Sequence, residues 1–396
     1  MVMPKSMRVA GRKGNSTVHE LKANLSILRI ILVVRETSAP YNQFSLSWVD
    51  KHDITICTYF ASDITPPKTI TLFEGNGSLM GFFRVLKAAL DAKHYDIIHV
   101  HSPHLGLLFL AGTLFARRKF ASSTVVTVHD SYPNFKLRNR LMFIPVFAGF
   151  QRVVCCGQAS YDSFPAFFKW LAGTRLRVVQ NGLDIARVDR IATSTRRRPL
   201  RTSDFTIVAI SRLVDIKNPF SVITAFQQSA EHASQTGRLV YIGDGPLRNS
   251  LITKSKEGGL ENQVEFTGLI PREKVFEYLL NADLFISTSR GEGLPVAVLE
   301  AMACGCPVLL SDIPPHREIA KGVDFIPLIK PDDVAGFARE IKKFRERSVS
   351  ERAVIGQRCR KLVEQRFSLP AMHAGYTEVY AQITGGQAPS LLDAVG

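Results

Sequence analysis

The stretch "RGEGLPVAVLEAMACG", residues 290–305, places two carboxylates at the junction of a predicted strand and a predicted helix. The apolar run "DLFISTS" (283–289) directly before it predicts the strand. Pro295 suits the first position of a helix, and Gly305 suits the left-handed residue just past a helix end. We therefore expect Glu292 on a loop at the carboxyl end of a strand and Glu300 in the second turn of the helix.

This arrangement predicts a site for an anion and for hydroxyl groups. The free N–H groups at a helix start carry a partial positive charge, which suits a diphosphate. Gly291 and Gly293 would let the loop backbone approach a ligand closely. Glu300 lies in the apolar segment "VAVLEAMA", so its carboxylate needs a polar partner, and the hydroxyls of a nucleotide ribose could be that partner.

Outward from this stretch, short apolar runs alternate with segments of helical length. The predicted strands are 27–34, 54–60, 96–100, 123–128, 152–156 and 175–179 in the first half, and 205–210, 238–243, 264–268, 283–289 and 307–312 in the second. Helical segments, among them 80–92, 218–231 and 272–282, lie between them. Alternation of this kind predicts an α/β fold with parallel sheets, here two doubly wound domains facing each other across a cleft.

Composition narrows the class of protein. A chain of 396 residues, 45% hydrophobic and 21% charged, is typical of a globular protein with two domains. The longest apolar run, 105–116, is too short to span a bilayer and predicts a buried helix. Six cysteines without metal-ligand spacing and the lack of a visible secretory signal predict a cytoplasmic protein.

The formal net charge of +15 favours polyanionic partners. Anionic lipid headgroups and phosphorylated ligands are candidates, whereas no nucleic-acid-binding motif accompanies the charge, so we expect no nucleic acid partner. The apolar and basic segment "NFKLRNRLMFIPVFAGF" (134–150) suggests peripheral contact with an anionic membrane, at its inner face. An ordinary amphipathic helix of the first domain is the alternative for this segment.

The 290–305 stretch resembles the signature of the retaining glycosyltransferases of family 4 (group 1), which have the GT-B fold. That signature has two glutamates with seven residues between them around a "GLP" turn, followed by E-A-M-A-x-G, and Glu292 and Glu300 have this spacing. "VAISRLVDIKNP" (208–219), "YIGDGPLRNSL" (241–251) and "VEFTGLIPREKVFEYL" (264–279) match further family segments in the expected order. The resemblance covers roughly residues 27–384.

The resemblance implies a division of the chain. Residues 1–26 are expected to form a basic extension, 27–185 an acceptor-side Rossmann-like domain, the Arg-rich stretch 186–204 a linker, and 205–368 the nucleotide-sugar domain. Residues 369–396 are expected to form a helix that crosses back to the first domain, and a tail.

The resemblance also implies roles for single residues. Glu292 would contact the transferred sugar, Arg212 and Lys217 would hold the diphosphate, and His129 would contact the sugar from the opposite domain. Fixed cations suit the charge that develops on a departing diphosphate. The nucleotide would contact Glu300 and a further set of residues, namely Gly293, Leu294, Pro295, Gly268 and Leu269.

One segment departs from the family. Where family members commonly have a glycine-rich turn after the first strand, this chain has "VVRETSAPYNQFSL" (33–46), in which Asn42 and Gln43 could supply hydrogen bonds to an acceptor. His99, His101 and His104 in "HVHSPH" are predicted to be structural. The chain has no Asp-x-Asp, so we expect no bound metal, and we expect no cofactor besides the nucleotide sugar donor.

The predicted activity is transfer of a hexose, with retention, from a UDP-, GDP- or ADP-linked sugar to a hydroxyl of a sugar or lipid-linked acceptor, in polysaccharide or glycolipid synthesis. A glycosidase would need a carboxylic acid with a raised pKa, which a diphosphate leaving group makes unnecessary. A nucleotide-sugar epimerase or a glycogen-synthase-like polymerase on the same fold remains an alternative. So does a non-catalytic polyanion-binding protein, which would show salt-dependent nucleic-acid binding.

Overall fold

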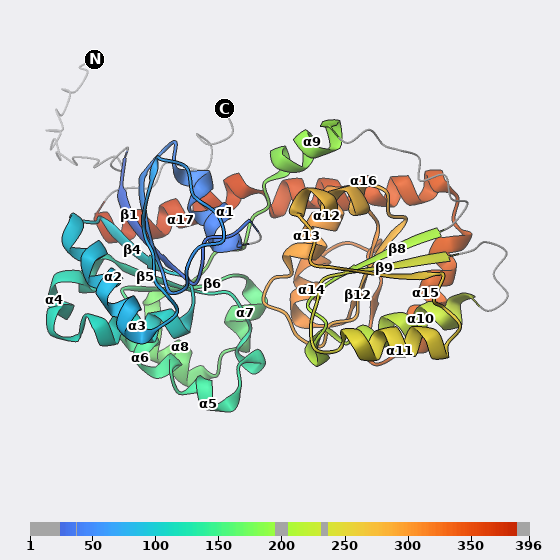
Figure 1. The fold of residues 1–396 in the computed structure, drawn as a ribbon, viewed down its shortest axis with the longest axis horizontal. Coiled ribbons are helices and arrows are strands. Elements are labelled where there is room, and N and C mark those ends of the chain that lie inside the picture. Colours follow the sequence, from blue (N-terminus) through green and yellow to red (C-terminus); the bar gives the residue numbers. More distant parts are fainter. Residues whose placement is uncertain (1–23, 37, 195–204, 231–236, 386–396) are drawn as a thin grey trace, which may run out of the picture.

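The computed structural model describes residues 24–36, 38–194, 205–230 and 237–385. They form two α/β domains that lie side by side, each with a central parallel sheet (Figure 1). The first sheet consists of β1 (Ser26–Ile31), β2 (Asp53–Thr58), β3 (Ile70–Phe73), β4 (Ile97–Val100), β5 (Thr124–Val128), β6 (Arg152–Cys155) and β7 (Leu176–Val178). The second consists of β8 (Phe205–Ile210), β9 (Gly237–Ile242), β10 (Val264–Gly268), β11 (Leu284–Ser287), β12 (Val308–Ser311) and β13 (Leu328–Ile329).

Helices cover both faces of each sheet (Figure 1). In the N-terminal domain they are α1 (Ala39–Phe44), α2 (Leu79–Ala92), α3 (Pro103–Gly112), α4 (Arg117–Phe120), α5 (Leu137–Arg140), α6 (Phe143–Gly149), α7 (Gln158–Ser163) and α8 (Ala166–Ala172). Next come α9 (Ile185–Ser194), α10 (Pro219–Ala230), α11 (Arg248–Glu257), α12 (Arg272–Leu280), α13 (Val296–Ala303), α14 (Pro314–Ile319), α15 (Val334–Glu346), α16 (Val349–Arg366) and α17 (Leu369–Thr384). Short 3-10 turns link several of them, including η2 (Leu114–Ala116) and η4 (Tyr132–Asn134).

The last helix returns to the first domain. The side chains of Met372, Tyr376 and Tyr380 on α17 are buried in the same apolar cluster as Ile27 of β1 and Ile54 of β2. α16 instead packs on α13 in the second domain. The two-domain GT-B architecture with a crossing C-terminal helix is therefore as the sequence predicts.

Strand order determines where a ligand can bind. The order is β3-β2-β1-β4-β5-β6-β7 in the first sheet and β10-β9-β8-β11-β12-β13 in the second, within the residues described. In each sheet the direction of winding reverses at one pair, β1 and β4 or β8 and β11. Loops at the carboxyl ends of such a pair separate and leave a crevice, which is the usual ligand site of this fold.

Local predictions were less accurate than the strand pattern. The short edge strands β3 and β13 were missed, and the glycine-poor turn after β1 contains the helix α1. The expected buried helix 105–116 ends at Gly112, and Leu114 and Phe115 beyond it are exposed. The segment 134–150 forms two separate helices, α5 and α6. The stretch 186–204 begins as α9, while 1–23 and 195–204 lie outside the described residues.

Candidate active site

The loops after β8 and β11 bring a lysine and a glutamate together at the crevice of the second sheet. Lys217 Nζ lies 2.5 Å from Glu292 Oε2, and both side chains are about 15% exposed or less. Ser289 Oγ donates a hydrogen bond to Glu292 Oε1 at 2.7 Å. The Glu292 carboxylate is therefore fixed on both oxygens, by one cation and one hydroxyl, before any ligand binds.

Glu300 also has a cationic partner. It is 5% exposed and lies on α13, where its carboxylate forms an ion pair with Arg272 at the start of α12. Burial raises the pKa of Glu300, and the Arg272 guanidinium opposes that rise. The sequence predicted that this carboxylate needs a partner, but it did not identify Arg272.

Both ion pairs line one cavity of about 320 Å³. Its wall includes most of the predicted donor-site residues, namely Arg212, Lys217, Gly268, Leu269, Glu292, Pro295 and Glu300. The Arg212 side chain is exposed and has no hydrogen-bond or ion-pair partner within the described part of the chain. Gly268 has φ +70°, a conformation that favours glycine and turns the backbone at the end of β10.

Gly291 and Gly293, the glycines beside Glu292, lie against the N-terminal domain and not against the predicted ligand site. A Cβ on Gly293 would lie 2.2 Å from the backbone oxygen of His129, and a Cβ on Gly291 would lie 2.3 Å from Asn134 Oδ1. Ser131 Oγ donates to the backbone oxygen of Glu292 at 2.8 Å. These glycines therefore permit close contact between the two domains, whereas the sequence analysis assigned them to close contact with a ligand.

Leu294, another predicted nucleotide contact, lies elsewhere, whereas its neighbour Pro295 lines the cavity. Leu294 is buried in the apolar core of the C-terminal domain and does not line the cavity. Pro295 was expected at the first helical position, but it is the N-cap of α13, which begins one residue later at Val296. Because the Leu294 side chain is apolar, burial in the core is more favourable for it than exposure to a polar ligand site.

His129 lies at the carboxyl end of β5 on the opposite side of the domain contact. Its Nε2 is 3.3 Å from His101 Nδ1, and its ring stacks on that of His101 with centroids 5.5 Å apart. Burial lowers the pKa of His129 to about 4, so the imidazole is neutral at pH 7. His129 can therefore donate or accept a hydrogen bond but adds no charge to the site.

A network of buried hydrogen bonds lies next to this histidine stack. Arg29 is fully buried, and its Nη1 lies 2.5 Å from His99 Nδ1. Because a guanidinium can only donate, His99 accepts at Nδ1 and carries its proton on Nε2, which lies 2.7 Å from Thr127 Oγ1. Burial, and then the charge of Arg29, lower the pKa of His99 well below its usual range. His99 and His101 are thus buried core groups, as predicted.

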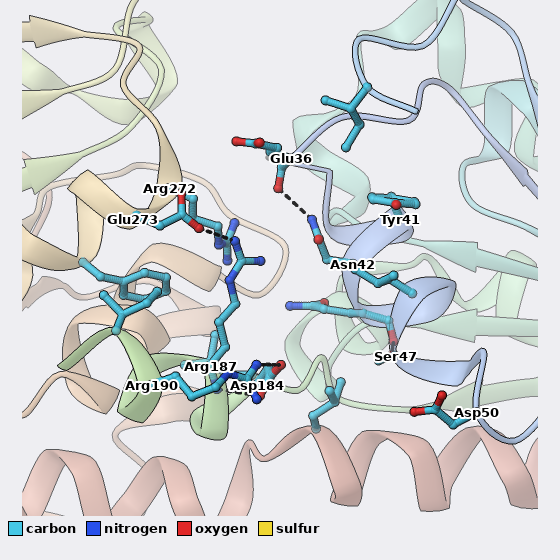
Figure 2. A pocket seen from close by; sticks show the side chains of 17 residues that line it. Glu36, Tyr41, Asn42, Ser47, Asp50, Asp184, Arg187, Arg190, Arg272 and Glu273 are labelled. Atoms are coloured by element: carbon cyan, nitrogen blue, oxygen red, sulfur yellow. Dashed lines mark hydrogen bonds and ion pairs between the residues drawn. The ribbon is translucent and has the colours of Figure 1, made fainter. Parts of the chain in front are cut away.

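A larger cavity of about 820 Å³ lies between the domains (Figure 2). One wall carries Arg187, Arg190 and Arg272, and the facing wall carries Asn42, Ser47 and Asp50. All three arginines are paired, Arg187 with Glu273 at 2.8 Å, Arg190 with Asp184 at 3.9 Å and Arg272 with Glu300, so their charges are partly neutralised. Arg272 lines both cavities, which makes it the side chain they share.

Gln43 is the notable group on the α1 side of the larger cavity. The residue is 6% exposed, and its side-chain oxygen has no hydrogen-bond partner among the described residues. A buried carbonyl oxygen without a donor is unfavourable, so a ligand hydroxyl would stabilise it. Asn42, the other residue singled out in the sequence, donates to the backbone oxygens of Glu36 and Ser38 and helps to hold α1.

Two family models match the chain, one to each half. The model described as "Glycosyltransferase Family 4" matches residues 47–187, and the model described as "Glycosyl transferases group 1" matches residues 191–362. The chain belongs to the group 1 glycosyltransferases of family 4. The two matched regions of this glycosyltransferase meet where the backbone of His129 lies against Gly293.

Relatives and solved structures agree with this assignment. The chain is 27% identical over 274 residues to the putative glycosyltransferase EpsD of Bacillus subtilis, which covers 67% of this chain and 71% of EpsD. It is 22% identical over 352 residues to an Escherichia coli galactosyltransferase named for UDP-Gal and a GlcNAc-diphosphoundecaprenol, covering 83% and 87%. The fold is similar to that of HepE from Anabaena, crystallised with UDP and glucose, with a TM-score of 0.72 at 20% identity over 90% of this chain and 100% of HepE.

Proposed function

We propose that this glycosyltransferase moves a hexose from a nucleotide-diphosphate sugar to a hydroxyl of a lipid-linked or sugar acceptor, with retention, in polysaccharide or glycolipid synthesis. The observation that carries the proposal is the set of groups that line the 320 Å³ cavity. Its wall holds the ion pair of Lys217 with Glu292, the ion pair of Arg272 with Glu300, and the guanidinium of Arg212, which is unpaired among the described residues. Cations suit a diphosphate, and the two carboxylates suit the hydroxyls of a sugar and of a ribose.

Each group then has a physical task. Arg212, whose guanidinium is free of partners in the described chain, and Lys217 would stabilise the negative charge that grows on the departing diphosphate. Lys217 has three N–H donors, so it can contact Glu292 and a phosphoryl oxygen together. Glu292, held by Ser289 and Lys217, would orient the sugar, and the neutral His129 would hydrogen-bond it from the other domain.

Because these two cations are present, we propose that the reaction needs neither a metal ion nor a cofactor. The departure of the diphosphate needs positive charge, and Arg212 and Lys217 supply it in place of a divalent ion. The side chains of the cavity do not select one nucleotide base for the donor. The names of the E. coli relative and of a Xanthomonas oryzae mannosyltransferase mention UDP-Gal and GDP-mannose, and both mention polyprenyl or undecaprenyl diphosphate acceptors. A cytoplasmic location remains a prediction.

The acceptor is proposed to bind in the 820 Å³ cavity. Its α1 wall follows β1 directly, at the switch point of the first sheet, and it presents amide and hydroxyl groups that suit sugar hydroxyls. Gln43→Leu should raise the KM for acceptor several-fold without changing donor affinity. Equal losses in both parameters would contradict this placement.

The central experiment is a thermal-shift screen of UDP-, GDP- and ADP-sugars, followed by NMR of the product made from the best donor. A true donor should raise the unfolding temperature, because it binds the native state only. The product should have the same anomeric configuration as the donor sugar. An inverted product would refute retention, a free epimerised nucleotide sugar would indicate an epimerase, and repeated addition would indicate a polymerase. Salt-dependent binding of nucleic acid without any donor binding would indicate a non-catalytic protein.

A further inference from the structure

Large apolar side chains are exposed on neighbouring helices of the N-terminal domain. Phe115 after α3, Leu137 and Leu141 around α5, Ile144 of α6, and Phe167 and Trp170 of α8 are all exposed. α3 packs on α6 and α6 packs on α8, so these helices form one continuous layer. Figure 1 shows α5 and α8 at the lower edge of the N-terminal domain, with α17 at its upper edge. We call this surface, defined by the six residues, the basic apolar flank.

The degree of exposure is unusual for such residues. Trp170 is 76% exposed, Leu137 is 78% exposed and Phe115 is fully exposed. Single exposed apolar residues are ordinary, but a group of large ones on neighbouring helices marks an interaction surface. Their burial against a partner would be favourable in proportion to the apolar area removed from water.

Charge indicates the kind of partner. Between residues 101 and 175 the sequence has nine lysines and arginines but only two acidic residues, Asp130 and Asp162. Lys136 and Arg138 on the flank are exposed, and neither has an ion-pair partner in the described parts of the chain. Protein interfaces are depleted in lysine, whereas an anionic bilayer attracts lysine and arginine next to apolar side chains. Tryptophan at the edge of such a surface also suits the headgroup level of a membrane.

We propose that the basic apolar flank docks this protein on the surface of an anionic lipid bilayer. None of the helices in the described ranges has the length and apolar character needed to cross a membrane, so the attachment is peripheral. The surface extends the segment 134–150 suggested by the sequence, because α8 and the end of α3 contribute to it. The proposal does not rest on the proposed function, since bilayer binding can be measured without donor or acceptor.

Docking through α5 would place the bilayer near the contact between the two domains. Asn134 at the end of η4 touches Gly291 in the Glu292 loop, and Leu137 is only three residues further along the chain. A bilayer that contacts α5 would therefore lie close to the contact between the two domains. An acceptor hydroxyl on a lipid headgroup could reach the site without leaving the membrane.

The chain carries a built-in probe for this test. It has two tryptophans, of which Trp48 is buried and Trp170 is exposed on the flank. With vesicles of phosphatidylglycerol and phosphatidylcholine, we expect co-sedimentation and a blue shift of the tryptophan emission. Trp170→Phe should abolish the shift while leaving co-sedimentation largely intact. Vesicles of phosphatidylcholine alone should bind at least about tenfold more weakly, since each basic residue near an anionic surface contributes about 1 kcal/mol.

Matched variants locate the surface. Lys136→Glu with Arg138→Glu should weaken binding to the anionic vesicles about tenfold or more, whereas Lys256→Glu with Lys342→Glu, on exposed positions of α11 and α15, should change it less than twofold. Leu137→Ser with Leu141→Ser should weaken it several-fold, and Val349→Ser with Val354→Ser, exposed on α16, should not. Unchanged unfolding temperatures would show that each variant folds.

Two results would overturn the proposal. The first is absence of binding to anionic vesicles, including the case in which the protein self-associates through Trp170 and thereby reveals a protein contact. The second is vesicle binding that the Lys136 and Arg138 substitutions leave unchanged and that produces no emission shift, which would assign the binding to another surface.

Discussion

The two edges of the cleft differ in how they hold their polar groups. On the C-terminal edge, Lys217 with Glu292 and Arg272 with Glu300 are charged groups kept in ion pairs. On the N-terminal edge, His129 and His101 are uncharged rings kept in a buried stack. Ion pairs at a cavity wall can exchange one partner for a charged ligand, whereas neutral buried rings can only shape and orient one. Under the proposed function, electrostatic stabilisation would therefore come from the C-terminal domain, and the N-terminal domain would add only neutral contacts that help to orient the sugar.

The largest effect should follow from removing the cation of the first ion pair. Lys217→Met should lower kcat by about 10²–10³-fold, the usual loss when one fixed stabiliser of developing charge is removed. It also leaves Glu292 partly buried without its counter-charge. Steady-state kinetics with the donor identified by thermal shift would measure the loss. Lys274→Met is the control, because Lys274 forms only an exposed pair with Glu277; equal activities of the two variants would contradict the role of Lys217.

The contact between the edges should be sensitive to one added methyl group. Gly293→Ala places a Cβ against the rigid backbone of His129, so the domains must separate or the loop must move, at a cost of about 1–3 kcal/mol. Gly291→Ala meets mainly the end of the Asn134 side chain, which can rotate away. We expect Gly293→Ala to lower both kcat and the free energy of unfolding more than Gly291→Ala does. Small-angle scattering would detect a more open arrangement, and equal behaviour of the variants would show that the contact is not tight in solution.

The difference between the edges also explains what the sequence could and could not predict. On the C-terminal edge, glutamate spacing and turn residues are local signals, so Glu292, Glu300 and the strand before them were located correctly. Arg272 was missed because its partner lies 28 positions away and no spacing rule connects them. The GT-B fold was predictable from alternating strands and helices together with the family resemblance.

The N-terminal edge was harder to predict because its residues are brought together by tertiary packing. His99 lies in β4 and His101 directly follows it, whereas His129 follows β5, so the His101 and His129 rings stack only because β4 and β5 are neighbours in the sheet. Nothing near Arg29 in the sequence indicates that Tyr380, 351 residues away on α17, contacts its Nη1. The close contact at Gly293 likewise depends on the other domain, so the glycines were assigned to a ligand.

A smaller effect should come from the second ion pair. Glu300→Gln keeps the shape of the side chain but removes its charge, so hydrogen bonds from ribose hydroxyls would weaken by about 1–2 kcal/mol, or roughly tenfold in nucleotide affinity. Glu273→Gln is a matched control, since Glu273 lines the larger cavity but not the donor cavity. Isothermal titration with the nucleoside diphosphate would measure both. A loss of similar size in both variants would indicate a general effect on α12 and not a ribose contact.

The smallest effect tests the neutral edge through pH. Burial lowers the pKa of His129 to about 4, against about 6.5 in an unfolded chain, so between these values the unfolded state binds the proton more readily. The free energy of unfolding should therefore fall as pH decreases from about 6.5 towards 4. The raised pKa values of Asp130 and Glu300 act in the opposite direction, since a carboxyl with a raised pKa favours the folded state at low pH.

Comparison with a single variant separates these contributions. His129→Gln retains a hydrogen-bonding side chain but removes the titration, so its unfolding free energy should depend less on pH, by up to about 1.4 kcal/mol per pH unit for one proton. Urea unfolding at several pH values between 7.5 and 4.5 would measure the two slopes. If the slopes were the same, the pKa of His129 in the folded state would equal its ordinary value of about 6.5. The imidazole would then be protonated below about pH 6.5, and in that range the N-terminal edge would carry a positive charge facing the Glu292 loop.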